Sequence, residues 1–513
     1  MSSGGGRIQL SAHGGEDKVL TGNPQITYFK SVYRRHTNFS IESVKQQFSG
    51  NPTFGEDVIA KIKGGDLLYK VYLEHDAVVK NKETTSNKKN IFHVERYGDS
   101  LIRECKLEIG GQTIDTQHAL WSRIYSDLTQ FNPSGHFGGD FNVSGAASGN
   151  GTLHQLITGN GYGLSTAGYS SPHNHFGVGT STVNGFDYLT ASGSYGSYIP
   201  GKITIPKIFI PLNFWFCRNP GLALPLIGLQ YHEVILKLSF EKIENLFRTI
   251  STGGPTYDRI PKLNPVSDNF TLWCDYVFLD KDERRRMSET SHEYLIEQVQ
   301  RNVDTLDSSS QSIELNFKNP VKEIIWVVQH ITYSGAGGRN QKFLGGDADL
   351  ASTQGFGDPT SSPVSIDHIN GNWSLKMNGL NRIPERDSKY FTNTQVWQHH
   401  TGFGGLPTFG FDAVEQASDS SSPVECGYDS IAVYSFALNP EDHQPSGSCN
   451  FSRVDEVKLV GSSLQIPRHN GNSPHTLTDI GGVHATNVRI SIFAVSYNIL
   501  RIMSGMGGLA YSE

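Results

Sequence analysis

Short runs in which apolar and polar residues alternate recur from one end of this chain to the other. One run reads IELNF (313–317), and comparable runs lie at 234–240 and 488–494. Because successive side chains of a β-strand point to opposite faces, each run predicts a strand with one face toward a core. Residues 324–328 are almost all apolar and predict a central strand covered on both faces. The chain is therefore expected to be all-β.

Helical patterns are few. In HALWSRIYSDLTQ (118–130) the apolar residues recur three and four positions apart, which predicts a helix with one buried face. DKDERRRM (280–287) predicts a short charged helix, and residues 292–299 fit either a helix or a strand. The charges of the short helix are expected to satisfy one another on a solvated face or an interface rather than to bind phosphate.

The size and composition fit a large β-protein with long loops. A length of 513 residues exceeds that of one ordinary core and implies two or more domains. Only 36% of the residues are apolar and 18% are charged, but 27 Phe, 21 Tyr and 6 Trp supply ample surface to bury. The 55 glycines fit ordered polar loops between strands.

The charge and the cysteines exclude several classes of protein. A net charge of −7 and a pI of about 6.3 do not provide the basic surface of a general nucleic-acid binder. The five cysteines are far apart and form no CxxC pair, which disfavours both a disulfide framework and a thiolate zinc site. A reducing compartment fits this pattern better.

The longest departure from the strand pattern is at 131–200, which has 15 Gly, two Asp and no Lys, Arg or Glu. Its many aromatic residues indicate a large ordered insertion at one end of a sandwich. Smaller insertions of similar composition are expected at about 335–372 and 399–425. If any Asn-X-Ser/Thr match is glycosylated, Asn142 and Asn150 in the long insertion are the expected sites, and chance explains the others.

Two aromatic segments that end in Asn-Pro, FWFCRNP (214–220) and YSFALNP (434–440), resemble each other. We interpret the first as an aromatic strand. A linker-like segment, 248–265, lies between them, so the chain is expected to hold two β-sandwiches in tandem.

No pattern points to catalysis or to a bound metal or cofactor. Residues 196–202 match GxxxxGK, but an isoleucine follows where a P-loop needs Ser or Thr, and the next segment is a strand. The pairs His173/His175 and His399/His400 have no acidic or thiol neighbours in sequence. They are therefore expected to be solvated loop histidines rather than metal ligands.

Nothing at the N-terminus is apolar and long enough for a signal peptide, and no window holds 18 uninterrupted apolar residues. No membrane span is therefore expected. Instead, LTGNPQITYFKSVYRRHTNF (20–39) combines a turn signal, a short alternating run and a basic-aromatic cluster. This segment is interpreted as an arm or a first strand that docks on another surface.

Five segments, in order along the chain, carry a family resemblance. The segments are residues 8–43, 210–234, 277–300 with 319–329, 434–457 and 487–512. Their first residues read, in the same order, IQLSAHGGEDKVLTGNPQITYF, IPLNFWFCRNPGLALP, VFLDKDERRRMSETSHEYL with NPVKEIIWVVQ, YSFALNPEDHQPSG and NVRISIFAVSYNIL. Together they resemble the major capsid protein of nucleocytoplasmic large DNA viruses. The 131–200 insertion is not covered.

The resemblance implies two tandem eight-stranded antiparallel jelly rolls and no enzymatic activity. In that family, homotrimers form pseudo-hexagonal capsomers that tile an icosahedral shell. Assembly takes place in the host cytoplasm around an internal membrane, with minor capsid and penton proteins as partners. Direct nucleic-acid binding is not expected, because the membrane separates the shell from the genome. Lys30, Arg34, Arg35 and His36 are then expected near the inner base of the capsomer, as contacts to minor proteins or neighbouring capsomers.

The resemblance and the patterns together predict an arm at 1–25, a first jelly roll at 26–247, a linker at 248–265, a second jelly roll at 266–500 and a tail at 501–513. Two alternative functions stay open. One is a minor capsid or spike paralogue with the same double jelly roll. The other is a carbohydrate-binding or carbohydrate-cleaving β-sandwich whose exposed aromatic residues stack on sugars.

Overall fold

The computed structural model has two compact units, Met1–Phe39 and Ser40–Glu513, and we describe each by itself. The residues that the structure describes are 4–12, 14–82, 90–93, 96–130, 153–159, 202–250, 257–258, 263–306, 310–334, 339–344, 364, 369–402, 404, 430–466, 475–476 and 488–511.

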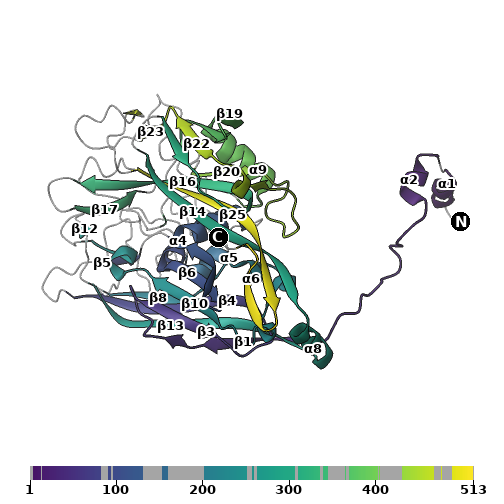
Figure 1. The fold of residues 1–513 in the computed structure, drawn as a ribbon, viewed down its shortest axis with the longest axis horizontal. Coiled ribbons are helices and arrows are strands. Elements are labelled where there is room, and N and C mark those ends of the chain that lie inside the picture. Colours follow the sequence, from purple (N-terminus) through teal and green to yellow (C-terminus); the bar gives the residue numbers. More distant parts are fainter. Residues whose placement is uncertain are drawn as a thin grey trace. The chain divides into compact units, whose positions relative to one another are not determined.

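The larger unit begins with a sandwich of two antiparallel sheets (Figure 1). One sheet has the order β1 (Phe39–Gln46), β13 (Leu263–Leu279), β4 (Leu67–Asn81), β8 (Lys202–Pro211), with β9 (Leu224–Pro225) beside β4. The other has the order β2 (Phe48–Ser49), β3 (Asp57–Ile62), β10 (Val234–Phe240), β6 (Ile102–Ile109), β7 (Gln112–His118). A small sheet of β12 (Tyr257–Asp258), β11 (Phe247–Ile250) and β5 (Asn90–His93) accompanies them.

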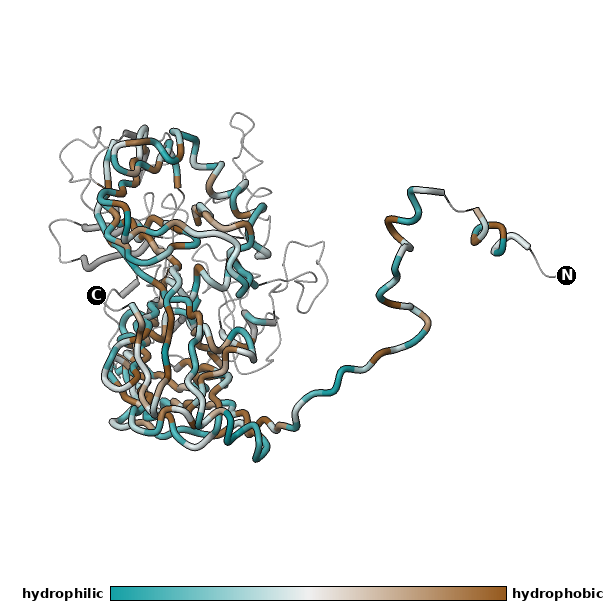
Figure 2. Tube along the Cα trace, turned by 45° about the vertical axis from the view of Figure 1, so that its right-hand side comes forward, coloured by the Kyte–Doolittle hydropathy of each residue, from teal (hydrophilic) through white to brown (hydrophobic). Residues whose placement is uncertain are grey.

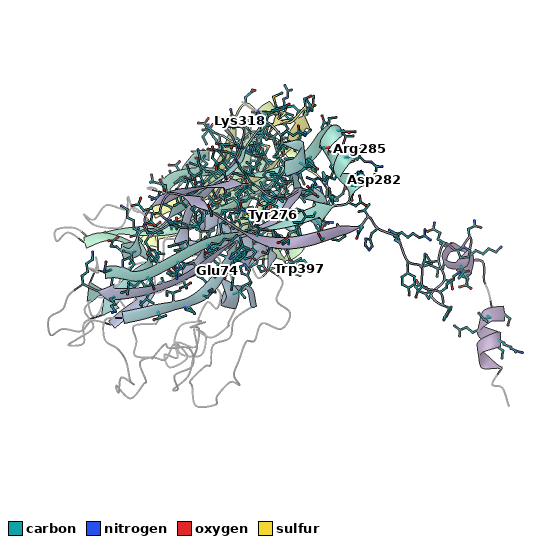
Figure 3. All side chains as sticks on the ribbon, turned by 90° about the horizontal axis from the view of Figure 1, so that it is seen from below. Glu74, Tyr276, Asp282, Arg285, Lys318 and Trp397 are labelled. Carbon is teal, nitrogen blue, oxygen red and sulfur yellow. The ribbon has the colours of Figure 1, made fainter. Side chains whose placement is uncertain are left out.

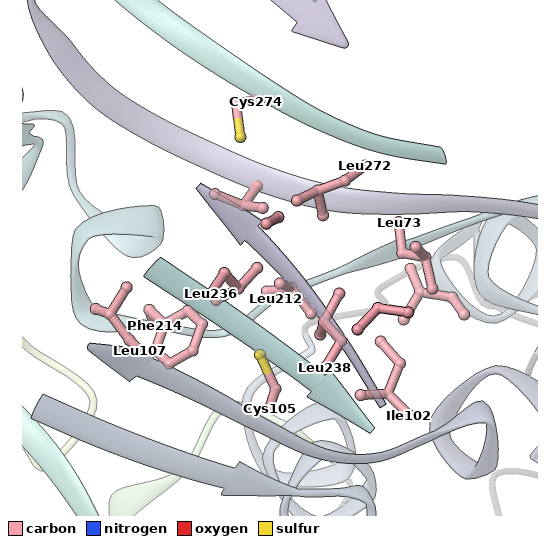
Figure 4. Packing of buried hydrophobic residues seen from close by; sticks show 14 of the residues in the cluster. Leu73, Ile102, Cys105, Leu107, Leu212, Phe214, Leu236, Leu238, Leu272 and Cys274 are labelled. Carbon is pink, nitrogen blue, oxygen red and sulfur yellow. The ribbon is translucent and has the colours of Figure 1, made fainter. Parts of the chain in front are cut away.

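The core between these two sheets follows from the alternation in the sequence. Every second residue of β10, from Val234 to Phe240, is buried, and β10 pairs with β3 and β6 on its two sides. Leu236 and Leu238 of β10 face Leu73 of β4 and Leu272 of β13 across the sandwich (Figure 4). The two sheets thus pack face to face through their apolar sides.

A second sandwich follows. Its larger sheet has the order β14 (His292–Leu306), β25 (Val488–Met503), β16 (Pro320–Ser334), β17 (Arg339–Leu344), with β20 (Ile431–Ser435) and β21 (Cys449–Asn450) on β16 and β26 (Met506–Leu509) on β25. The facing sheet has the order β15 (Gln311–Glu314), β22 (Val457–Ser462), β18 (Asn372–Met377), β19 (Leu380–Asp387). β23 (Gln465–Ile466) pairs with β24 (His475–Thr476).

Helices are short. They are α1 (Gly5–Ser11), α2 (Asp17–Thr21), α3 (Tyr97–Leu101), α4 (Ala119–Thr129), α5 (Leu153–Thr158), α6 (Trp215–Arg218), α7 (Ile243–Leu246), α8 (Lys281–Glu289) and α9 (Gln395–His399), with single turns η1 (Pro220–Leu222), η2 (Leu226–Gly228), η4 (Tyr390–Thr394) and η6 (Phe451–Arg453). The helices predicted at 118–130 and 280–287 are confirmed as α4 and α8. The ambiguous segment 292–299 is part of β14. The aromatic strand predicted at 214–220 is wrong, because residues 215–218 form α6 and η1 begins at Pro220.

The central strand predicted at 324–328 is confirmed, and its two faces belong to different cores. Ile324 and Trp326 of β16 point into the second sandwich. Ile325 and Val327 point the other way and pack against Trp121 and the other buried residues of α4. Helix α4 follows directly on a strand of the first sandwich, so it fills the space between the two sandwiches and fixes one to the other.

Three of the expected boundaries differ from the structure. β13 pairs with β4 along nearly its whole length, so the second sandwich begins after Leu279 and not at residue 266. Residues 26–38 form no strand and are exposed, and the first sandwich begins with β1. The expected tail at 501–513 contributes the end of β25 and β26 to the large sheet. In each case pairing with a strand distant in sequence decided the boundary.

Candidate functional site

The predicted contact residues Lys30, Arg34, Arg35 and His36 all lie exposed in the N-terminal unit. The apolar residues between them are exposed as well: Tyr28 is 90% exposed and Phe29 99%. Figure 2 shows hydrophobic residues spaced along this segment among polar ones. Neither α1 nor α2 buries a residue. We call residues 4–38 the arm, and its described part is a strip of basic and aromatic side chains available for contact.

Most of the predicted insertions, and with them Asn142, Asn150 and the pair His173/His175, lie outside the described residues. α5 is described within the longest insertion, and β17 within the second. Among the described residues, no helix is long and apolar enough to cross a membrane, and no group of three or more His, Cys, Asp or Glu side chains is arranged to hold a metal ion.

The two sandwiches meet where β14 lies beside β7. The backbone N–H of Val299 donates a 3.1 Å hydrogen bond to Asp115 on β7, and the side-chain amide of Gln298 donates to the backbone oxygen of Ile114. Burial raises the pKa of Asp115 to about 6, although Val299 and Gln117 donate hydrogen bonds to it. At this edge of β14 the backbone N–H of Val299 is therefore bound by the carboxylate of Asp115 and not by a backbone oxygen of β7. The two sheets are not joined by strand pairing there.

Ion pairs cross the same junction. Glu297 on β14 accepts hydrogen bonds from Arg218 on α6 at 2.5 Å and from Lys322 on β16 at 2.6 Å. The Lys322 side chain is only 3% exposed, and it also donates to the backbone oxygen of Pro440. Arg218 lies over the ring of Tyr125 on α4. The first sandwich thus supplies Arg218, and the second supplies both of the other charges.

His400 corrects the expectation of a solvated loop histidine. Its side chain is 2% exposed and lies between two carboxylates: Nε2 is 3.1 Å from Glu323 and Nδ1 is 3.1 Å from Glu441. Its neighbour His399 is half-buried, and the Nδ1 atom of His399 lies 3.0 Å from the backbone oxygen of Leu438. The sequence placed neither carboxylate near the histidine, since both come from segments 41 residues or more away.

The outer surface carries an exposed apolar pair beside α9. Trp397 is 80% exposed and Leu438 is 75% exposed, and the contact of His399 with Leu438 holds their two segments together. Figure 3 labels Trp397 among the side chains of the larger unit. A tryptophan is seldom left in water without a partner. We call Trp397 and Leu438 the α9 patch.

The charged run at 280–286 forms the cap and start of α8, and the contacts of its side chains described here go to the backbone and to the first sandwich rather than to one another. Asp280 caps the helix by accepting a 2.9 Å hydrogen bond from the backbone N–H of Glu283. Arg284 pairs with Asp66 of the first sandwich at 3.2 Å. Asp282 and Arg285 are exposed on the outside of the helix (Figure 3).

The residues at the junction were missed by the sequence reasoning, but one signal was present. Lys322 and Glu323 are consecutive charges in strand β16, directly before its apolar run at 324–328. Pairing with β25 skips from Val321 to Glu323, so the strand is irregular at Lys322 and both charges are buried. Charges inside a central strand indicate partners from other segments.

Two family models together match nearly the whole chain. The model described as the N-terminus of a major capsid protein matches residues 27–280, and the model described as a large eukaryotic DNA virus major capsid protein matches residues 283–508. The division between them lies between β13 and the body of α8, where strand pairing separates the two sandwiches.

Individual relatives agree with these matches. The major capsid protein of Pyramimonas orientalis virus is 38% identical over 512 residues, which cover 99% of this chain and 100% of the relative. The major capsid protein of Paramecium bursaria Chlorella virus 1 is 30% identical and covers 99% and 100%. A solved structure of the PBCV-1 virus capsid has a TM-score of 0.62 and 26% identity, covering 95% of this chain and 100% of that one.

Proposed function

This chain belongs to the major capsid proteins of large eukaryotic DNA viruses and has the double jelly-roll fold, and from this premise we propose that three copies form one capsomer of the shell. Full-length similarity to a capsid protein, 38% over 99% of the chain, carries this proposal. Two sandwiches fixed to each other by α4 make one rigid block, and three such blocks give an outline with six similar corners.

Light scattering on the purified protein tests this proposal. The expected mass is three times 56.5 kDa, the mass of one chain, at micromolar concentration. A stable monomer under these conditions would contradict the proposal, because a trimer that builds a shell needs large permanent interfaces. Electron microscopy of the same sample should show towers with a hexagonal outline.

The proposal also covers the other proteins of the shell, the place of assembly and glycosylation. The arm residues Lys30, Arg34, Arg35 and His36 serve as contacts to minor capsid proteins or neighbouring capsomers, near the inner base of the shell. Penton proteins complete the shell, which assembles in the host cytoplasm around an internal membrane. Any glycan is carried at Asn142 or Asn150. The exposed basic and aromatic side chains of the arm support the first of these assignments.

We assign the α9 patch to the contact between copies of this chain. Its two side chains are large, apolar and exposed, on segments joined by the contact of His399 with Leu438, and a chain that assembles with itself has a second copy to cover them. Because a closed trimer uses different surfaces of each subunit at one seam, the patch meets another region of the neighbouring copy.

Trp397→Ser is expected to weaken the trimer about thirtyfold or more, because truncating a buried interface tryptophan costs about 2 kcal/mol or more of binding energy. Light scattering over a dilution series measures the shift. Leu380→Ser on β19, where Leu380 is 76% exposed, is the matched control and should keep the trimer intact. Equal trimer stability of Trp397→Ser and the wild type would remove the patch from the seam.

A further inference from the structure

A row of six charged side chains of alternating sign runs through the junction of the two sandwiches. Neighbours in the row lie 2.5–3.1 Å apart, except that Lys322 and Glu323 are consecutive residues of β16. The alternation is complete only when the histidine is positively charged. In order, the row consists of Arg218, Glu297, Lys322, Glu323, His400 and Glu441.

The position of His400 requires a charged ring. Both ring nitrogens face carboxylates, and a neutral imidazole would turn a lone pair toward one of them. Burial opposes charge on the ring, but Glu323 and Glu441 outweigh it and raise the pKa of His400 to about 9. Burial opposes charge on both carboxylates too, yet the adjacent histidine lowers the pKa of each.

The residues after His400 tie the second sandwich to the end of α4. The backbone N–H of Gly402 donates to Leu128 O at 2.7 Å, and that of Gly404 donates to Asp127 O at 2.9 Å. Glu441 accepts hydrogen bonds from the backbone N–H (2.9 Å) and hydroxyl (2.8 Å) of Thr401. Carbonyl groups at the end of a helix need such partners. A Cβ on Gly402 would lie 2.3 Å from Asp127 O, so a glycine is required for this close approach.

We propose that protonated His400 is a fastener that holds residues 400–402 and Gly404 over the end of α4, and that loss of its proton in alkaline solution releases them. When the ring is neutral, the carboxylates of Glu323 and Glu441 repel each other across it, and the ionic attraction between them and His400 is lost. Thr401, which donates hydrogen bonds to Glu441, is then no longer held in place. The hydrogen bonds from Gly402 and Gly404 to the end of α4 break with it. We name residues 400–402 together with Gly404 the strap.

The direction of the pH effect follows from the groups around the ring. His400 faces Glu323 from β16 and Glu441 from the segment after β20, while Lys322 and Arg218 lie further along the row. A histidine whose pKa is raised on folding stabilises the fold fully below pH 6.5, and this contribution is lost as the pH rises toward 9. Asp115, with a pKa of about 6, titrates mostly below this window.

Hydrogen exchange at millisecond resolution, corrected for the intrinsic rate at each pH, tests the fastener. In the wild type, protection of peptides that cover the strap should fall about a hundredfold between pH 6.5 and 9.5, since each pKa unit is a factor of ten in the linked equilibrium. Peptides in β14 and β25 should keep their protection. His400→Gln should show low strap protection with no such fall. His399→Gln changes the neighbouring half-buried histidine, which contacts neither carboxylate, and should behave as the wild type.

Glu441→Gln provides an independent check if His400→Gln does not fold. It removes one of the two carboxylates, so the fall in strap protection should move to lower pH. Strap protection that stays level from pH 6.5 to 9.5 in the wild type would overturn the proposal, as would an equal fall in His400→Gln. A fall shared by β14 and β25 would mean global unfolding and would overturn it too.

Discussion

Glu297→Gln is expected to lower the free energy of unfolding of the larger unit by about 3–5 kcal/mol, the usual cost of removing one partner from a buried ion pair. Glu297 compensates two cations, Arg218 and Lys322, and both would keep their charge, Lys322 in a place that water barely reaches and Arg218 in a partly exposed one. The glutamine keeps the shape of the side chain, so the loss reports on charge and not on a cavity. Urea unfolding followed by fluorescence measures it.

Glu293→Gln is the matched control on the same strand. Glu293 pairs with Arg501 at 2.8 Å, but both side chains are more than half exposed, and such pairs contribute at most about 1 kcal/mol. The double variant Glu297→Gln with Lys322→Met should recover part of the loss, because it removes one stranded cation. An equally small effect of Glu297→Gln and Glu293→Gln would show that the junction does not depend on its charges.

Deletion of residues 1–25 is expected to leave trimers intact and to abolish most shell assembly. None of the described residues of the arm is buried, so the deletion removes no part of either core. Light scattering should give the mass of three shortened chains, while electron microscopy of cells that produce particles should show few closed shells. Dissociated trimers would refute the assignment of the arm to contacts outside the trimer.

A charge reversal separates the role of the basic cluster from that of the deleted residues. The triple variant Lys30→Glu, Arg34→Glu and Arg35→Glu keeps the full arm and should also reduce shell assembly, because its contacts are proposed to be ionic in part. Arg285→Glu, an exposed arginine on α8, is the control for a change of charge elsewhere. Full assembly by the triple variant would place the contacts on other residues of the arm.

Local patterns in the sequence predicted the elements well. Period-two alternation identified β10, and the continuous apolar run identified β16 as a strand covered on both faces. The spacing of Leu120, Trp121, Ile124 and Leu128 identified α4 and its buried side. In each case the pattern reflects which side chains of one helix or strand are buried, and this can be read from the sequence of that element alone.

The junction could not be predicted in the same way, because its partners are far apart in sequence. Glu297 and Arg218 are 79 residues apart, and His400 and Glu441 are 41 apart. A pattern in one segment does not state which other segment will face it. The same limit explains the boundary errors, since β13 carries a strand signal that does not name β4 as its partner.

The sharing of one core by both halves has a consequence for synthesis of the chain. Ile296, Leu500 and Ile502, which belong to strands of the second sandwich, pack into the core of the first. The N-terminal half therefore cannot finish its core until the last strands have left the ribosome. A chain that ends before Leu500 lacks Leu500 and Ile502 and leaves the apolar surface that they cover exposed, which favours aggregation. Completion of the first core thus depends on the last strands of the chain to be synthesised.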